Sequence, residues 1–205
     1  MIATATSVRG AAPRKRCVVA SAVIGVSLAL CLTLARAAQA ATLLPAPSIE
    51  AGPHDDRSQT AVIAGGCFWG IQAVFEHVKG VTRVLAGYSG GAKDTAAYET
   101  VSTGRTGLAE SVQIMFDPHQ VSYGRILQIY FSVGHDPTEL NRQGPDVGTQ
   151  YRSAIFYAND DQKRVAQSYV AQLTRAGIYP RPIVTQLDPL VAFYPAPRRS
   201  LHRSL

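Results

Sequence analysis

Cysteine is scarce in this sequence of 205 residues: three are present, and only Cys67 lies after residue 40. A single cysteine in that part of the chain cannot form an internal disulfide bond. The five histidines form no pair with metal-ligand spacing, and no Cys-x-x-Cys pair occurs. These absences exclude a disulfide-stapled scaffold, and they leave no metal cofactor to be expected.

An excess of charge is also missing from the body of the chain. The formal net charge of +6 includes five basic and no acidic residues among the first 40, which leaves 15 basic residues against 14 acidic ones. Three of those 15 lie in the last eight residues. The segment Gly87–Gly91 has neither the lysine nor the spacing of a phosphate-binding loop. A nucleic-acid or nucleotide partner is therefore not expected.

The N-terminus has the pattern of a targeting segment. Basic residues 14–16 precede an apolar stretch from Cys17 to Ala35, and Ala38-Gln39-Ala40 matches a signal cleavage site. Cleavage after Ala40 predicts an exported, periplasmic protein of 165 residues. An uncleaved membrane anchor is the alternative, because the apolar stretch is near the lower length limit of a membrane span.

The remaining chain is long enough for one domain with a hydrophobic core. We expect a linker over residues 41–58, a single domain over 59–196 and an atypical basic tail over 197–205. Alternation of apolar strands and amphipathic helices predicts an α/β (α+β) fold, a two-layer sandwich of a mixed sheet with helices. The strands are predicted at 60–65, 81–88, 110–116, 152–157 and 182–187, and the helices at 68–78, 123–133 and 160–176.

Two long connections, residues 90–109 and 134–150, carry many polar residues and glycines. Connections of this length without regular structure are usually functional, so we expect them to line a site.

Cys67 lies at the junction of the first predicted strand and the first predicted helix. Unpaired N–H groups and the helix dipole at such a position favour the thiolate, which is the nucleophilic form of cysteine. Phe68 and Trp69 predict a small apolar pocket beside the sulfur, and the neighbouring glycines predict a tight turn. The alternative is a small buried residue with no chemical role.

Four segments together resemble the peptide methionine sulfoxide reductases of the A type. These are Gly66-Cys67-Phe68-Trp69-Gly70, the motif at 87–91, the segment at 107–110 and the run from His135 to Ser153. The resemblance covers roughly residues 60–195. It implies a ferredoxin-like core with long functional loops.

The resemblance also implies a reaction. Cys67 attacks the sulfur of methionine-S-sulfoxide and becomes a sulfenic acid, while methionine leaves. Glu110 is the implied acid, and Tyr98 and Tyr151 are the implied hydrogen-bond donors to the sulfoxide oxygen. A carboxyl group in an apolar site has its pKa raised by desolvation, which suits an acid near neutral pH. Taken without the resemblance, Glu110 reads as an exposed edge carboxylate and the tyrosines as packing residues.

The substrate-binding residues implied by the resemblance are Phe68, Trp69 and Asp146. The two aromatic side chains hold the S-methyl group, and Asp146 orders the site. No bound cofactor is implied. The partners are oxidised proteins or peptides that contain methionine-S-sulfoxide, together with an external thiol of the thioredoxin type, because no cysteine follows Cys67. A monomer is expected.

Two positions depart from the family pattern. Leu108 stands where the family usually has a histidine, and the tail after Ala196 is basic where the family continues with acidic residues and a histidine. A catalytically impaired member that binds methionine sulfoxide segments without turnover is therefore the alternative function. A different cysteine enzyme, such as an acyl transferase with a Cys–His pair, is a third hypothesis, and it predicts an essential histidine.

Overall fold

The fold is described from a computed structural model over residues 43–52 and 58–197. The predicted signal peptide, residues 1–40, and the predicted tail beyond residue 197 lie outside the described residues.

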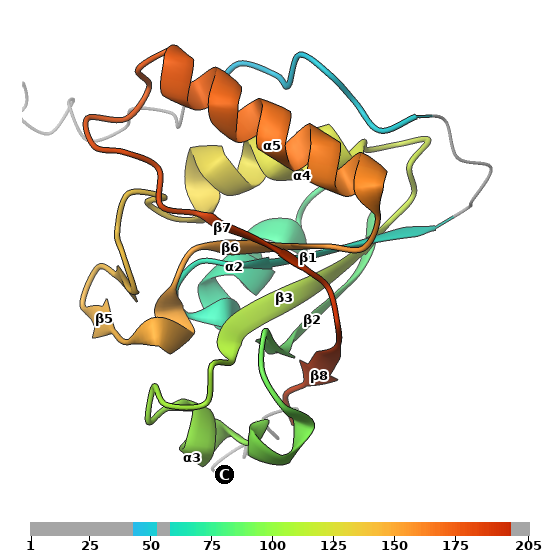
Figure 1. The fold of residues 1–205 in the computed structure, drawn as a ribbon. Coiled ribbons are helices and arrows are strands. Elements are labelled where there is room, and N and C mark those ends of the chain that lie inside the picture. The colour runs from blue at the N-terminus through green and yellow to red at the C-terminus, as the bar shows by residue number, and fades with distance from the viewer. Residues whose placement is uncertain (1–42, 53–57, 198–205) are drawn as a thin grey trace, which may run out of the picture. The chain divides into compact units, whose positions relative to one another are not determined.

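A mixed sheet of six strands forms the centre of the fold, in the order β7-β6-β1-β3-β2-β8 (Figure 1). Neighbouring strands are antiparallel except β6 and β7, which are parallel. The strands are β1 (Gln59–Ala64), β2 (Val81–Ser89), β3 (Ala109–Phe116), β6 (Ala154–Tyr157), β7 (Gln186–Pro189) and β8 (Phe193–Pro195). A separate two-stranded sheet pairs β4 (Arg142–Gln143) with β5 (Asp146–Val147).

Three helices pack on one face of the sheet: α2 (Phe68–Phe75), α4 (Tyr123–Ile129) and α5 (Asp160–Arg175). Side chains alternate between the two faces, so that Ile63 joins the main core under the helices whereas Val62 joins a smaller cluster on the other face. Leu190 and Phe193 pack against that smaller cluster. The predicted two-layer α+β fold is therefore confirmed, with the helices on one side of the sheet.

The helix ends follow the expected capping chemistry. Ser122 caps α4 by accepting a hydrogen bond from the N–H of Arg125, and Asn159 caps α5 by accepting one from the N–H of Gln162. After α4 the chain continues as one π-helical turn, η2 (Tyr130–Gly134), and Gly177 follows α5 with a φ of 60°.

The long connections contain more regular structure than predicted. Residues 90–109 include a 3-10 turn, η1 (Lys93–Thr95), and a four-residue helix, α3 (Tyr98–Val101). Residues 134–150 include β4, β5 and the start of another 3-10 turn, η3 (Thr149–Tyr151). The sequence prediction of irregular loops was wrong in these segments, because elements this short produce no readable periodicity.

The strand predicted at 182–187 was displaced. Pairing with β6 begins only at Gln186, and before it the N–H of Val184 donates to the carbonyl of Pro137 at 2.8 Å. Pro182, inside the predicted strand, has no N–H to donate to a ladder. The short edge strand β8, which pairs with the end of β2, was not predicted.

Residues 43–52, part of the predicted linker, contain no helix or strand but run along α4 and α5. The Tyr169 hydroxyl donates to the Pro45 carbonyl at 2.8 Å, and the N–H of Leu44 donates to the Ser132 hydroxyl at 2.9 Å. Glu50 accepts hydrogen bonds from the Ser122 hydroxyl and the Gly124 N–H. This segment is therefore attached to the domain by its own backbone groups and by the Glu50 carboxylate.

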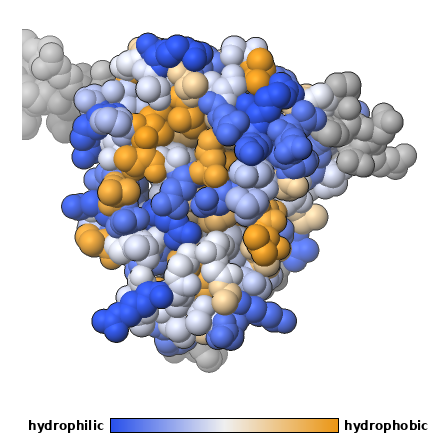
Figure 2. Space-filling view, in the orientation of Figure 1, coloured by the Kyte–Doolittle hydropathy of each residue, from blue (hydrophilic) through white to orange (hydrophobic). Residues whose placement is uncertain are grey.

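Over the described part of the chain, none of the helices has the length and apolar character needed to cross a membrane. Figure 2 shows hydrophobic side chains in several groups separated by hydrophilic ones on the face in view.

Candidate functional site

Cys67 immediately precedes α2 and is separated from the central strand β1 by Gly65 and Gly66. It is half-buried, and its side chain makes no capping hydrogen bond to the helix. The preceding Gly66 has a φ of 87°, and a Cβ there would lie 2.6 Å from Cγ of Gln143. Only glycine fits at this position, so the turn that presents the thiol is fixed by its own backbone and by the neighbouring loop.

Glu110 lies next to this turn. Its carboxylate oxygen Oε2 accepts a hydrogen bond of 3.1 Å from the backbone N–H of Phe68, the residue after Cys67. The side chain is buried, with 3% of the residue exposed. Burial raises the pKa of Glu110, the Phe68 N–H lowers it, and the charge of Asp146 raises it further. The net upward direction favours a protonated carboxyl group beside the thiol.

Tyr151 connects the second long loop to the same turn. Its carbonyl accepts a hydrogen bond of 3.1 Å from the N–H of Gly66. Burial raises the pKa of its phenol, and the nearby charges of Glu110, Asp146, Tyr98 and Cys67 raise it further. The four residues expected to be catalytic, and Asp146, therefore lie close enough together for their charges to interact.

Phe68 and Trp69 differ in their environments. Phe68 is buried, and its ring centroid lies 5.2 Å from that of Trp69, which is 41% exposed. Tyr98, the first residue of α3, is 43% exposed. Phe68 therefore lies in the core beneath the site, while Trp69 and Tyr98 present aromatic surface to solvent around it.

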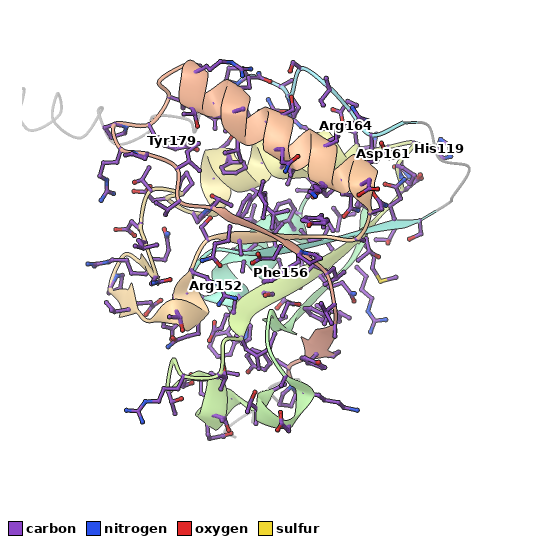
Figure 3. The ribbon with its side chains drawn as sticks, viewed as in Figure 1. His119, Arg152, Phe156, Asp161, Arg164 and Tyr179 are labelled. Atoms are coloured by element: carbon purple, nitrogen blue, oxygen red, sulfur yellow. The ribbon has the colours of Figure 1, made fainter. Side chains whose placement is uncertain are left out.

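Arg152 joins the loop that leads into β3, the strand of Glu110, to the turn η3, which contains Tyr151. Its guanidinium donates to the carbonyls of Gly107 and Thr149 at 2.9 and 3.0 Å, and to Oε1 of Gln186 at 2.9 Å. Figure 3 shows Arg152 near Phe156, on the side of the sheet away from α4 and α5. These three neutral acceptors hold the guanidinium in place although it is buried.

His135 packs behind the Cys67 turn. Its Nε2 lies 2.6 Å from the Ser153 hydroxyl, its Nδ1 lies 3.3 Å from the Tyr130 carbonyl, and its ring stacks on that of Tyr130. A Cβ on Gly65 would lie 2.8 Å from the imidazole. Desolvation lowers the pKa of His135 to about 4, so the imidazole is neutral near pH 7.

Leu108 is fully buried in the main core. A Cβ on Gly91 would lie 2.8 Å from its Cγ. The position where the family pattern has a histidine is thus filled by an apolar side chain, and the hydrogen bond between Phe68 and Glu110 is present beside it.

Sequence reasoning missed three residues that surround the site: Tyr88, Arg152 and His135. Tyr88 lies within the motif Gly87–Gly91, which was noticed for its glycines rather than for its tyrosine. His135 lies in the second long connection and Arg152 opens the strand predicted at 152–157, and nothing in the residue pattern shows which contacts either side chain makes. Over the described residues there is no group of three or more His, Cys, Asp or Glu side chains that could hold a metal ion.

Comparison with known proteins gives a consistent result. Residues 59–204 match the family model for peptide methionine sulfoxide reductase. Peptide methionine sulfoxide reductase MsrA 2 of Mesorhizobium japonicum is 64% identical over 139 residues, which cover 68% of this chain and 71% of that protein.

Two solved structures have a similar fold. The reduced form of Mxr1 from Saccharomyces cerevisiae has a TM-score of 0.60 at 28% identity and covers 72% of this chain and 84% of that one. Methionine sulfoxide reductase A of Corynebacterium diphtheriae has a TM-score of 0.57 at 29% identity and covers 76% of this chain and 86% of that one.

Proposed function

The chain belongs to the peptide methionine sulfoxide reductase family, and we propose that it reduces methionine-S-sulfoxide to methionine at Cys67. The observation that carries this proposal is the hydrogen bond from the Phe68 N–H to Glu110. This hydrogen bond holds a buried carboxyl group close to the thiol, so that the carboxyl group can protonate the substrate that the thiol attacks.

In the proposed reaction, the Cys67 thiolate attacks the sulfoxide sulfur while Glu110 transfers its proton to the sulfoxide oxygen. The attack forms a bond between the Cys67 sulfur and the methionine sulfur. The protonated oxygen then moves from the methionine sulfur to the Cys67 sulfur, and the sulfur–sulfur bond breaks with its electron pair going to methionine, which leaves. Cys67 is then a sulfenic acid, so that cysteine is oxidised by two electrons and the sulfoxide is reduced by two. Protonation is needed because an unprotonated oxide is a poor leaving group. The phenols of Tyr98 and Tyr151 donate hydrogen bonds to the same oxygen.

Substrate selection follows from the aromatic residues beside the thiol. Phe68 and Trp69 hold the S-methyl group, and Asp146 orders the loop facing them. Trp69 also borders an open hollow of about 410 Å³, lined by residues of α2 and β2 and by the chain from Pro195 to Pro197. Access by methionine sulfoxide within a polypeptide, as well as by the free amino acid, is part of the proposal.

An external thiol completes the cycle. Cys67 is the only cysteine after residue 40, so no second cysteine there is available to resolve the sulfenic acid. A thioredoxin-type dithiol attacks the sulfenic sulfur, water leaves, and the resulting mixed disulfide is reduced by the second thiol of the dithiol. The enzyme acts as a monomer that repairs oxidised proteins.

Export to the periplasm is part of the proposal and depends on the basic, apolar and small-residue pattern of residues 1–40. Amino-terminal sequencing of the protein made in a bacterial host tests it. A new terminus at Ala41 supports cleavage, whereas an intact terminus in the membrane fraction supports the anchor.

The reaction at Cys67 is tested by Cys67→Ser and by trapping the sulfenic acid. After one turnover without reductant, wild type gains a mass equal to one oxygen and reacts with dimedone, whereas the variant does neither. The impaired-member alternative is motivated by Leu108 in the core, and it predicts peptide binding with no oxygen gained by wild type.

A further inference from the structure

Tyr88 has a buried hydroxyl with no hydrogen-bond partner among the described residues. The residue is fully buried in β2, and its ring centroid lies 5.7 Å from that of Phe68. Burial of a hydroxyl without a partner is unfavourable, and buried groups of this kind are uncommon in folded proteins. A phenylalanine of the same shape would bury no unpaired hydroxyl. The presence of the hydroxyl therefore indicates a functional role.

The position of Tyr88 identifies its neighbour. In the ladder between β2 and β3, Tyr88 is directly opposite Glu110. Directly opposed side chains share one face of the sheet with Cβ atoms about 4.5–5.5 Å apart, so one hydrogen bond or one bridging water can connect the phenol to the carboxyl group. Phe68 contacts both residues, the ring of Tyr88 through its own ring and the carboxylate of Glu110 through its N–H.

We infer that Tyr88 is a positioning residue that donates a hydrogen bond to Glu110 when the carboxyl group has lost its proton. The inference rests on the proposed function, since it concerns the acid of that reaction. Of the two carboxylate oxygens of Glu110, Oε2 accepts the hydrogen bond from the Phe68 N–H. When Glu110 transfers its proton to the sulfoxide oxygen, a second buried oxygen with negative charge needs a donor, and the Tyr88 hydroxyl provides it while keeping its own proton.

Among the charged and titratable groups around Tyr88 and Glu110, Tyr88 is the buried hydrogen-bond donor. Burial, together with the nearby charges of Glu110, Tyr98 and Glu99, raises the pKa of Tyr88 to about 12, so the phenol stays protonated over the working range. The groups facing the pair come from the turn before α2 and from α3, β5 and η3: Cys67, Tyr98, Glu99, Asp146 and Tyr151. Of the tyrosines, Tyr98 and Tyr151 are more exposed and serve the substrate oxygen.

Tyr88→Phe in the full-length protein tests the inference. The account expects kcat to fall by about 10- to 100-fold, the effect of losing a hydrogen bond to a charged group. The alkaline limb of the kcat profile should move to higher pH, because a carboxylate without that donor holds its proton more tightly. The melting temperature at pH 5 should stay the same or rise, since the hydroxyl removed has no partner there.

Tyr179→Phe is the matched control. Its hydroxyl donates to the Phe131 carbonyl at 2.6 Å, and Figure 3 shows Tyr179 beside α4 and α5, well separated from Arg152. This variant should lose stability and keep both kcat and the pH profile.

A fall in the melting temperature of Tyr88→Phe with an unchanged kcat and alkaline limb would overturn the inference. If wild type itself reduces no sulfoxide, the proposed function fails instead, so the two failures are distinguishable in one assay.

Discussion

The backbone N–H of Phe68 and Oε2 of Glu110 are joined by a hydrogen bond of 3.1 Å, which ties the first turn of α2 to β3. Cys67 precedes Phe68, so the same contact fixes the distance between nucleophile and acid within narrow limits. The pairing of β1 with β3, which places Ala64 opposite Ser111, brings these two segments together. The acid–nucleophile arrangement is therefore a consequence of strand register.

Replacement of Glu110 by glutamine should slow the chemical step by roughly 100-fold or more, the range typical of a lost general acid. Binding of the substrate should be retained, because the amide oxygen still accepts from the Phe68 N–H. Single-turnover oxidation of Cys67 by a methionine-S-sulfoxide peptide measures the step. Asp161→Asn on α5 is the control and should match wild type (Figure 3). An unchanged single-turnover rate would remove Glu110 as the acid.

The same substitution should change the pH dependence of folding stability. Burial raises the pKa of Glu110 above its ordinary value of 4.5 in the folded state. The contribution of Glu110 to folding stability is fully present below pH 4.5 and is lost as pH rises through the folded-state pKa. As pH rises, wild type should therefore lose stability and Glu110→Gln should not. The free energy of unfolding of the variant relative to wild type should increase by about 1.4 kcal/mol for each unit by which the pKa of Glu110 is raised. Urea unfolding between pH 4 and pH 8 measures it, and a constant difference would contradict the expectation.

Folding stability should depend on the ionisation of His135 in the opposite direction with pH. Its pKa is lowered to about 4 from 6.5, so its contribution is complete above pH 6.5 and is lost as pH falls towards 4. The loss amounts to at most about 3 kcal/mol. His135→Gln should be less stable than wild type at pH 7 but should lose less stability on acidification. Urea unfolding at pH 7, 5.5 and 4.5 tests this, with the exposed His119→Gln as control. Parallel curves for wild type and His135→Gln would rule the effect out.

Arg152→Lys should weaken the connection between the two loops of the site. An ammonium group cannot reach the Gly107 and Thr149 carbonyls and Gln186 together, so a loss of about 1–3 kcal/mol in unfolding free energy is expected. Activity should fall as well, since one of these segments leads into β3, which carries Glu110, and the other contains Tyr151. Thermal unfolding and kcat are the measurements, and Arg164→Lys on α5 is the control. Wild-type stability and kcat for Arg152→Lys would show that the guanidinium contacts are dispensable.

Much of the fold was predictable because its long elements have clear hydrophobic patterns. The helix predicted at 160–176 lies at Asp160–Arg175, and the strand predicted at 81–88 lies at Val81–Ser89. The short elements were not predictable. Strand β8 has three residues, and its position depends on pairing with the end of β2 rather than on its own pattern.

The site was predictable to the extent that its residues lie in distinctive motifs. Cys67 was identified from its position between a strand and a helix, and Glu110 by resemblance. The structure places them next to each other through Phe68. The supporting residues could not be found in this way. Whether the Tyr88 hydroxyl has a partner, or which carbonyls Arg152 reaches, depends on contacts between strands and loops that are distant in sequence.

Turnover of the two epimers of a methionine sulfoxide peptide by the purified protein, with dithiothreitol as reductant, tests the central claim most directly. The account predicts reduction of the S epimer alone, with no reduction by Cys67→Ser. No turnover of either epimer, with the Cys67 thiol confirmed intact by mass, would contradict it.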